Sequence, residues 1–117
     1  MMNYRRGDVV LVPFPFSDQT TIKKRPAVII SSDDYNDSSS DVIIIAITSR
    51  ISEVMEIGES FIIDWRRAGL MKSSSIKPAI STIEKTLILK DLGKLSDRDM
   101  YSMNNALAEL LELTAMI

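Results

Sequence analysis

The sequence predicts a mainly β fold of the α+β class, a small and strongly bent β-sheet or barrel with an amphipathic helix at its C-terminal end. Two observations predict it. Short segments rich in β-branched residues recur along the chain, and a helical period of apolar residues occurs only near the end. With 117 residues, 45% of them hydrophobic and 26% charged, the chain can bury a core of its own. We expect one domain over residues 1–117.

Six segments are predicted to be strands because they combine β-branched and other apolar residues with flanking turn residues. They are Val9–Pro13, Ala27–Ser31, Val42–Ser49, Phe61–Ile63, Ser75–Ile80 and Thr86–Leu89. The third is a continuous apolar run as far as Ile47, which is typical of a central strand buried on both faces. Its polar end, Thr48 to Arg50, is therefore expected to leave the core.

The C-terminal segment has the signals of one helix of about 20 residues. Ser96 is a capping residue with an acid, Asp99, three positions later. The apolar stripe that follows is expected to pack on the core or on a second protomer, and it consists of Met100, Met103, Leu107, Leu110 and Leu111.

Residues 33–40 are rich in Asp, Asn and Ser, and they show no apolar period. This composition predicts a turn-rich loop rather than a regular element. Its aspartates lack the spacing and the glycine of a calcium loop, so a solvated turn is the expected structure.

The chain has no cysteine and no histidine. Disulfides, thiol nucleophiles, imidazole bases and the usual zinc sites are therefore excluded, and we expect no metal and no cofactor. No signal peptide opens the sequence, and the longest apolar run, Val42–Ile47, is too short to span a bilayer. A cytoplasmic protein without membrane contact is expected.

The charge is nearly balanced but unevenly distributed. A net charge of −2 argues against a protein that coats nucleic acid by general electrostatic attraction. However, Lys23, Lys24 and Arg25 are consecutive, whereas four aspartates fall within residues 33–41. This segregation allows a local cationic pocket.

Arg25 is the first candidate for a functional residue. It directly precedes Pro26, which favours an extended backbone and the first position of a strand. A guanidinium held there could bind a phosphate through two hydrogen bonds and stabilise charge that develops on it. The alternative is a solvated arginine at a strand edge. Lys24 beside it would raise the local positive potential.

Three further segments could contribute to the same site, and each has a simpler alternative. Thr48 and Ser49 could donate hydroxyl hydrogen bonds to phosphate oxygens, or they could satisfy backbone groups at the strand end. Lys77, before Pro78, could bind an anion or be an exposed strand charge. Asp18-Gln19 could supply a base or a hydrogen-bonding group, although turn chemistry explains the same residues.

Taken together, these segments resemble the MazF/PemK family of toxin endoribonucleases. The resemblance lies in the order and spacing of several motifs along essentially the whole chain. They are Arg6–Val10, Lys24–Ile30, Ala46–Ser49, Gly69-Leu70, Ser75–Pro78, Thr82–Glu84 and Gly93–Ser96.

The resemblance implies an SH3-like β-barrel with a C-terminal helix, a homodimer, and cleavage of single-stranded RNA in a groove formed across or beside the dimer interface. It implies a cognate antitoxin that blocks this groove, and contact with DNA only through that antitoxin. The family's catalytic arginine and threonine fall on Arg25 and Thr48. The expected RNA contacts are Asp18, Gln19, Lys24, Ser49 and Lys77. The ribose 2′-hydroxyl would be the nucleophile, without a metal, giving 2′,3′-cyclic phosphate and 5′-hydroxyl ends.

The sequence departs from the family in its first loop, residues 16–24, which contains no glycine. In this respect it resembles the PemK-type branch. Two alternatives stay open. One is a non-catalytic toxin of the same barrel fold that poisons DNA gyrase and depends on the last residues, Ala115 to Ile117. The other is an inactive barrel that only binds an antitoxin.

Overall fold

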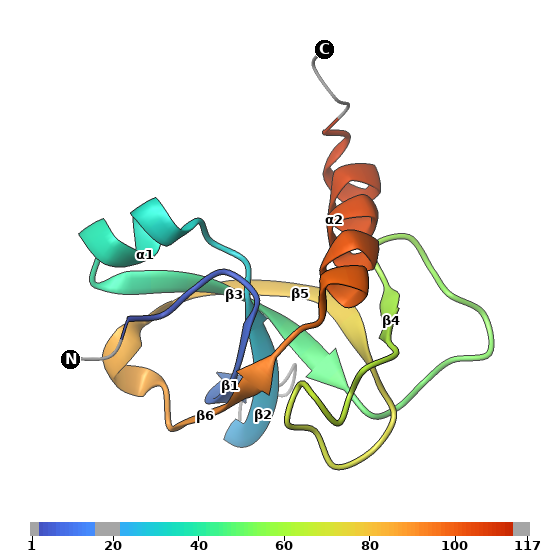
Figure 1. Ribbon diagram of the computed structural model, residues 1–117, viewed down its shortest axis with the longest axis horizontal. Helices are drawn as coiled ribbons and strands as arrows, with labels where there is room; N and C mark the ends of the chain where they lie inside the picture. Colours follow the sequence, from blue (N-terminus) through green and yellow to red (C-terminus); the bar gives the residue numbers. More distant parts are fainter. Residues whose placement is uncertain (1–2, 16–21, 114–117) are drawn as a thin grey trace.

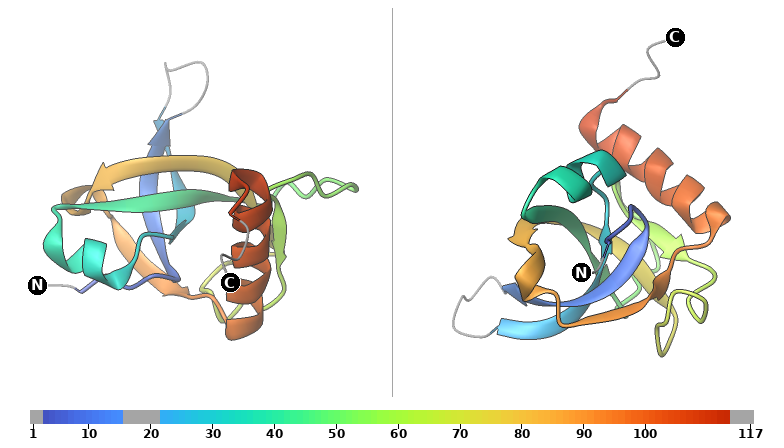
Figure 2. Two further views of the ribbon diagram at one scale, coloured as in Figure 1. Left: turned by 90° about the horizontal axis from the view of Figure 1, so that it is seen from above. Right: turned by 60° about the vertical axis from the view of Figure 1, so that its left-hand side comes forward.

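The computed structural model describes residues 3–15 and 22–113, and its centre is one antiparallel sheet in the order β4-β5-β3-β2-β1-β6. The sheet curls into a half-barrel, and a single long helix stands at one side next to β4 (Figures 1 and 2). The strands are β1 (Asp8–Pro15), β2 (Ile22–Ile29), β3 (Asp41–Thr48), β4 (Ser60–Ile62), β5 (Ser74–Glu84) and β6 (Lys90–Lys94). The predicted mainly β fold with a C-terminal helix is confirmed.

Two apolar clusters lie on the two faces of this sheet. Successive residues of a strand point to opposite faces, so β1, β2 and β3 each contribute to both clusters. The first cluster packs against the C-terminal helix and includes Val9, Val28, Ile45, Ile47, Ile76, Met103 and Leu107. The second lies on the other face and includes Val10, Val12, Phe14, Ala27, Ile44 and Ala46. The third strand is therefore buried on both faces, as its continuous apolar run predicts.

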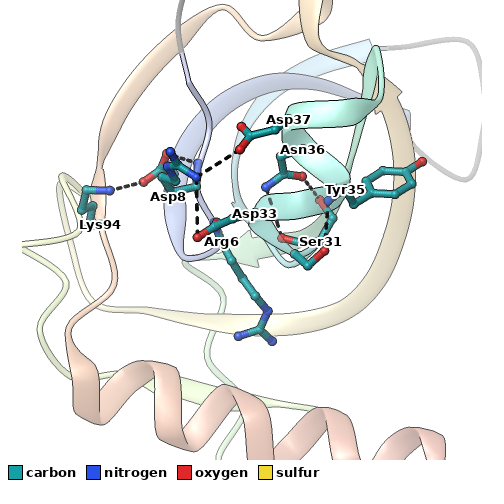
Figure 3. Close-up of polar contacts among 10 residues, drawn as sticks. Arg6, Asp8, Ser31, Asp33, Tyr35, Asn36, Asp37 and Lys94 are labelled. Carbon is teal, nitrogen blue, oxygen red and sulfur yellow. Dashed lines mark hydrogen bonds and ion pairs between the residues drawn. The ribbon is translucent and has the colours of Figure 1, made fainter.

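Residues 33–38 form a short helix, α1 (Asp33–Ser38), so the prediction of a loop without regular structure was wrong. The helix starts because the Ser32 hydroxyl accepts a hydrogen bond from the Tyr35 N–H at 3.1 Å. Asp33 and Asp34 in its first turn add favourable charge at the helix N-terminus. The buried Asn36 anchors it, since its amide donates to the Ser31 carbonyl at 3.2 Å (Figure 3). Capping, rather than an apolar period, makes this helix.

The prediction of a strand at Thr86–Leu89 was also wrong. A 3-10 turn, η1 (Lys85–Leu87), occupies its start, and β6 begins only at Lys90. Of the apolar residues in this segment, Ile88 packs against the second cluster and anchors the turn, while Leu87 and Leu89 are exposed. A backbone hydrogen bond from Leu89 N–H to the Leu11 carbonyl, 2.8 Å long, then leads the chain into β6.

The C-terminal helix, α2 (Asp97–Leu111), has the predicted cap, because the Ser96 hydroxyl accepts from the Asp99 N–H at 3.3 Å. It contains 15 residues rather than about 20, since Glu112 takes a left-handed conformation with φ 54° and ends it. Met103 and Leu107 of the predicted stripe are buried in the first cluster. In the described part of the chain, no helix has the length and apolar character that a membrane span requires.

Candidate functional site

The space for a site opens where β2 and β3 separate. Their pairing is Ala27 with Ala46, Val28 with Ile45 and Ile29 with Ile44. The next residue of β2 toward its N-terminus is Pro26, which has no N–H to donate to a neighbouring strand. Continuing the same register by two residues would place Arg25 opposite Thr48 on one face of the sheet.

Arg25 lies inside a strand rather than at its first position, which corrects the prediction from the sequence. β2 begins at Ile22, because β1 continues to Pro15 and pairs with it, with Val12 opposite Arg25. The extended backbone expected before Pro26 is present, but pairing with β1 rather than the proline sets where the strand begins.

A bulge in β5 brings Lys77 to the same face. Ile45 pairs with Ile80, but the next residue, Ala46, pairs with Lys77, so Pro78 and Ala79 are extra residues in β5. A proline is tolerated at such a point because a bulge leaves backbone groups outside the ladder. Three side chains that are far apart in the sequence, Arg25, Thr48 and Lys77, therefore meet at one end of the sheet.

These three side chains line one cavity of about 680 Å³, called here the first cavity. Its remaining lining residues are Phe14, Ala46, Ile47, Arg50, Ser52, Glu59 and Ala79. Among the described residues that line it, three are cations and one is a carboxylate, Glu59. A concave surface with an excess of one charge concentrates the opposite charge, so this cavity attracts anions.

The Thr48 hydroxyl can accept a backbone hydrogen bond at the end of β3 and also donate a hydrogen bond to a ligand. Its Oγ1 accepts a hydrogen bond from the Arg50 N–H at 3.1 Å, so it does satisfy a backbone group at the strand end. That bond uses a lone pair of the hydroxyl and not its proton. The two interpretations of Thr48 from the sequence are thus compatible.

A second cavity, of about 520 Å³, lies on the other side of Arg25. Lys24 and Ser49 line this second cavity and not the first, whereas Arg25 lines both. For Lys24 the reason is the period of a strand, because it precedes Arg25 in β2 and so points to the opposite face. Ser49 follows the last residue of β3. Asp18 and Gln19 lie outside the described residues.

Three lining residues of the first cavity were not predicted as site residues from the sequence: Arg50, Ser52 and Glu59. They follow β3 in a segment without any regular period. Glu59 reaches the first cavity through a tight turn. Its Oε1 accepts from the Glu56 N–H at 3.0 Å, and its own N–H donates to the Glu56 carbonyl at 3.0 Å. Gly58 in this turn has φ 89°, and a Cβ there would lie 3.1 Å from that of Pro78. The sequence signal that could have indicated this turn was Gly58, a glycine close to the acidic residues Glu56 and Glu59.

Shifted pKa values occur away from both cavities. The Arg98 guanidinium donates to both oxygens of Asp64, at 2.8 and 2.7 Å, and holds the pKa of that carboxyl well below its usual range. This pair lies at the start of α2 and stabilises the loop after β4. Within residues 3–15 and 22–113, no three carboxylates gather where they could hold a metal ion.

Comparisons with known proteins agree with this fold. The family of PemK-like, MazF-like toxins of type II toxin-antitoxin systems matches residues 5–111. Endoribonuclease MazF of Staphylococcus saprophyticus is 39% identical over 107 residues, which cover 88% of this chain and 87% of that protein.

Two solved structures show the same fold at lower sequence identity. An endoribonuclease from a mycobacterial species, in complex with its cognate antitoxin, superposes with a TM-score of 0.74 at 20% identity, covering 95% of this chain and 97% of that one. MazF from Deinococcus radiodurans superposes with a TM-score of 0.75 at 18% identity, covering 96% of this chain and 99% of that one. The chain therefore belongs to the family of PemK-like, MazF-like toxins of type II toxin-antitoxin systems.

Proposed function

We propose that this chain is a toxin endoribonuclease that cleaves single-stranded RNA in the first cavity without a metal ion. One observation carries the proposal: β2, β3 and β5 bring Arg25, Thr48 and Lys77 to a single cavity at the end of the sheet. Family membership and the curated relative, which is named an endoribonuclease, support RNA cleavage as the activity.

In the proposed reaction the ribose 2′-hydroxyl oxygen attacks the adjacent phosphorus. The bond from phosphorus to the 5′ oxygen breaks, the 2′-hydroxyl gives its proton to a base, and the 5′ oxygen takes up a proton from water. The products are a 2′,3′-cyclic phosphate and a 5′-hydroxyl, and DNA is spared because it lacks the nucleophile. No histidine is required.

Each residue has a role that follows from its chemistry. Arg25 binds the non-bridging oxygens through its planar guanidinium and stabilises the charge that grows on them. The Thr48 hydroxyl donates to one of these oxygens, and Lys77 and Arg50 attract the RNA backbone. Glu59, the carboxylate of the first cavity, accepts the proton of the 2′-hydroxyl.

The partners in this proposal are single-stranded RNA, a second copy of the chain and a cognate antitoxin that blocks the cavity. The mycobacterial endoribonuclease of similar fold was solved with its cognate antitoxin, which supports an antitoxin partner. The toxin would act in the cytoplasm as one domain over residues 1–117, and it would reach DNA only through the antitoxin.

The test is cleavage by purified protein with a metal chelator, using a long single-stranded RNA and DNA of the same sequence. Cuts in RNA alone, with 2′,3′-cyclic phosphate ends, are expected. Arg25→Ala should lower the rate by at least about 1000-fold, as loss of a guanidinium that stabilises a transferring phosphoryl group does. Arg66→Ala is the matched control, because Arg66 stacks on Trp65 with 4.3 Å to the ring centre and lines neither cavity.

Cleavage by Arg25→Ala at the normal rate would contradict the assignment of the first cavity. A folded protein that cuts no RNA at all would instead favour a non-catalytic toxin or an inactive barrel. Ala115 to Ile117, on which the gyrase-poison alternative depends, lie outside the described residues.

A further inference from the structure

The second cavity has a lining unlike the chain as a whole. The chain has 16 acidic and 14 basic residues, yet among the described residues that line this cavity none carries a carboxylate. Five of its lining residues are cations: Lys23, Lys24, Arg25, Lys72 and Lys90. Such a one-sided group of charges attracts anionic ligands.

The same cavity is also lined by apolar residues, which are Leu11, Ile47, Leu70, Met71 and Leu92. Met71 is 94% exposed, although a large apolar side chain gains free energy when it is covered. Ser49 also lines the cavity, and its hydroxyl can donate a hydrogen bond. The hydroxyl of Ser74, another lining residue, donates to the Lys72 carbonyl at 2.9 Å. The cavity thus combines five cations with apolar side chains, one of which, Met71, is largely exposed.

Two glycines hold the wall of the second cavity in place. Gly69 has φ 80°, and a Cβ at this position would overlap the carbonyl of Leu92 in β6. A Cβ on Gly93 would lie 2.7 Å from the backbone of Ala68. The loop that carries Leu70, Met71 and Lys72 is therefore seated directly against β6, and the cavity is formed before any ligand arrives.

A nucleotide matches this lining, because it joins a phosphate to a flat base whose faces can pack on apolar side chains. Arg25 and Ile47 line both cavities, so the two cavities adjoin. An RNA strand with its reacting phosphate in the first cavity must continue beyond Arg25, and every further nucleotide brings one more phosphate and one more base.

We propose that the second cavity binds a neighbouring nucleotide of the RNA strand whose phosphate reacts in the first cavity. Lys24, Lys72 and Lys90 contact its phosphates, and its base covers Leu70 and Met71. The base at this position then contributes to the choice of cleavage site. This inference rests on the proposed function, because it places the cleaved phosphate beside Arg25.

The first test is the salt dependence of RNA binding by Lys72→Ala/Lys90→Ala. The probe is an RNA oligonucleotide that carries the mapped site with a 2′-deoxyribose at the cleaved position, so that it binds without being cut. Each lost phosphate contact makes the negative slope of log K against log salt less steep by about 0.7. The slope of the double variant should therefore be less steep than that of the wild-type protein by about 1.4. Lys85→Ala is the control, because Lys85 lines neither cavity. An unchanged slope would overturn the proposal.

The second test follows the methyl signals of ¹³C-labelled methionine by NMR. Met71→Leu assigns the Met71 signal, and Met103, which is 0% exposed, is the internal reference. The Met71 signal should shift with the uncleavable RNA and with a nucleoside monophosphate, and much less with inorganic phosphate. RNA binding that leaves the Met71 signal in place would overturn the proposal.

Three further outcomes separate this inference from the proposed function. A Met71 shift with an acidic peptide but not with RNA would assign the cavity to a protein partner. A shift with the monophosphate in a protein that neither binds nor cuts RNA would contradict the proposed function and assign the cavity to a free nucleotide. RNA cleavage lost in Arg25→Ala, together with an unmoved Met71 signal, would keep the proposed function and reject the second cavity.

Discussion

Thr48 shows how a single residue can serve both the fold and the site. Its hydroxyl oxygen accepts from the Arg50 N–H, which secures the turn after β3, and its proton is still available to a phosphate oxygen. Arg50 itself lines the first cavity, so the hydrogen bond that ends the strand also positions a cation.

For Thr48→Ala we expect the cleavage rate to fall by about 10- to 1000-fold, because one hydrogen-bond donor to the transition state is lost. Thr48→Ser should keep most of the rate, since it retains the hydroxyl. Single-turnover cleavage of an RNA with one site measures this, with circular dichroism as the check of folding. An unchanged rate in a folded Thr48→Ala protein would remove Thr48 from the site.

Glu59→Gln tests the proton acceptor without disturbing the turn. The Gln oxygen can still accept from the Glu56 N–H, so folding and RNA affinity should be unchanged. The single-turnover rate should fall by about 100- to 10,000-fold, the range for loss of a general base. Glu56→Gln is the matched control and should cleave normally. Equal rates in the two variants would show that Glu59 only supports the turn.

At the scale of elements, α2 does more than cover the first apolar cluster. The buried Asp99 carboxylate accepts from the N–H groups of Ile63 and Asp64, each at 2.9 Å, directly after β4. The Arg98 side chain holds Asp64 from the next position of the helix. The first turn of α2 therefore positions the start of the loop that forms the wall of the second cavity.

Asp99→Ala should destabilise the fold by about 2 to 5 kcal/mol, because it leaves two backbone N–H groups without their acceptor. Asp99→Asn should cost less, since its amide oxygen can still accept one of these bonds. Urea unfolding at neutral pH measures both. Asp97→Ala is the control, an exposed acid of the same turn that should have a smaller effect. Equal losses for positions 97 and 99 would contradict the role given to Asp99.

The whole molecule has a net charge of −2, yet the charged residues that line its two cavities are mostly cations. Arg25 joins the two cavities, and seven different cations line them: Lys23, Lys24, Arg25, Arg50, Lys72, Lys77 and Lys90. The acidic residues of α1 are instead close to Arg5 and to the N-terminal segment, as with the Arg6 N–H that donates to Asp33 at 2.8 Å (Figure 3). Under the proposed function, RNA is therefore attracted to the two cavities rather than to the whole surface.

The salt dependence of binding by the wild-type protein should reflect this arrangement. With at most seven cations per chain in contact with phosphates, the slope of log K against log salt should be no steeper than about −5 per chain. Binding of the uncleavable RNA between about 50 and 200 mM salt measures it. A clearly steeper slope would mean that the strand also follows cations outside the two cavities.

The predictable part of the fold was the part with strong local patterns. The run at Val42–Ile47 and the cap at Ser96 were recognised because β-branched content and capping residues act over a few neighbours. The same local criteria failed at α1 and at Thr86–Leu89. There Ser32, Asn36 and Ile88 determine the structure through a cap and through contacts with distant strands.

By itself, the amino-acid sequence determined the mainly β class, the C-terminal helix, the chemistry without histidine or cysteine, and the identity of Arg25, Thr48 and Lys77 as candidates. These depend on residue types and on patterns between near neighbours. Only the tertiary structure decided which candidates share a cavity. Strand register and the β5 bulge join Arg25, Thr48 and Lys77, and the alternation of side chains along β2 sends Lys24 to the opposite face. Register is a relation between distant segments, and a shift of one residue would exchange the two faces.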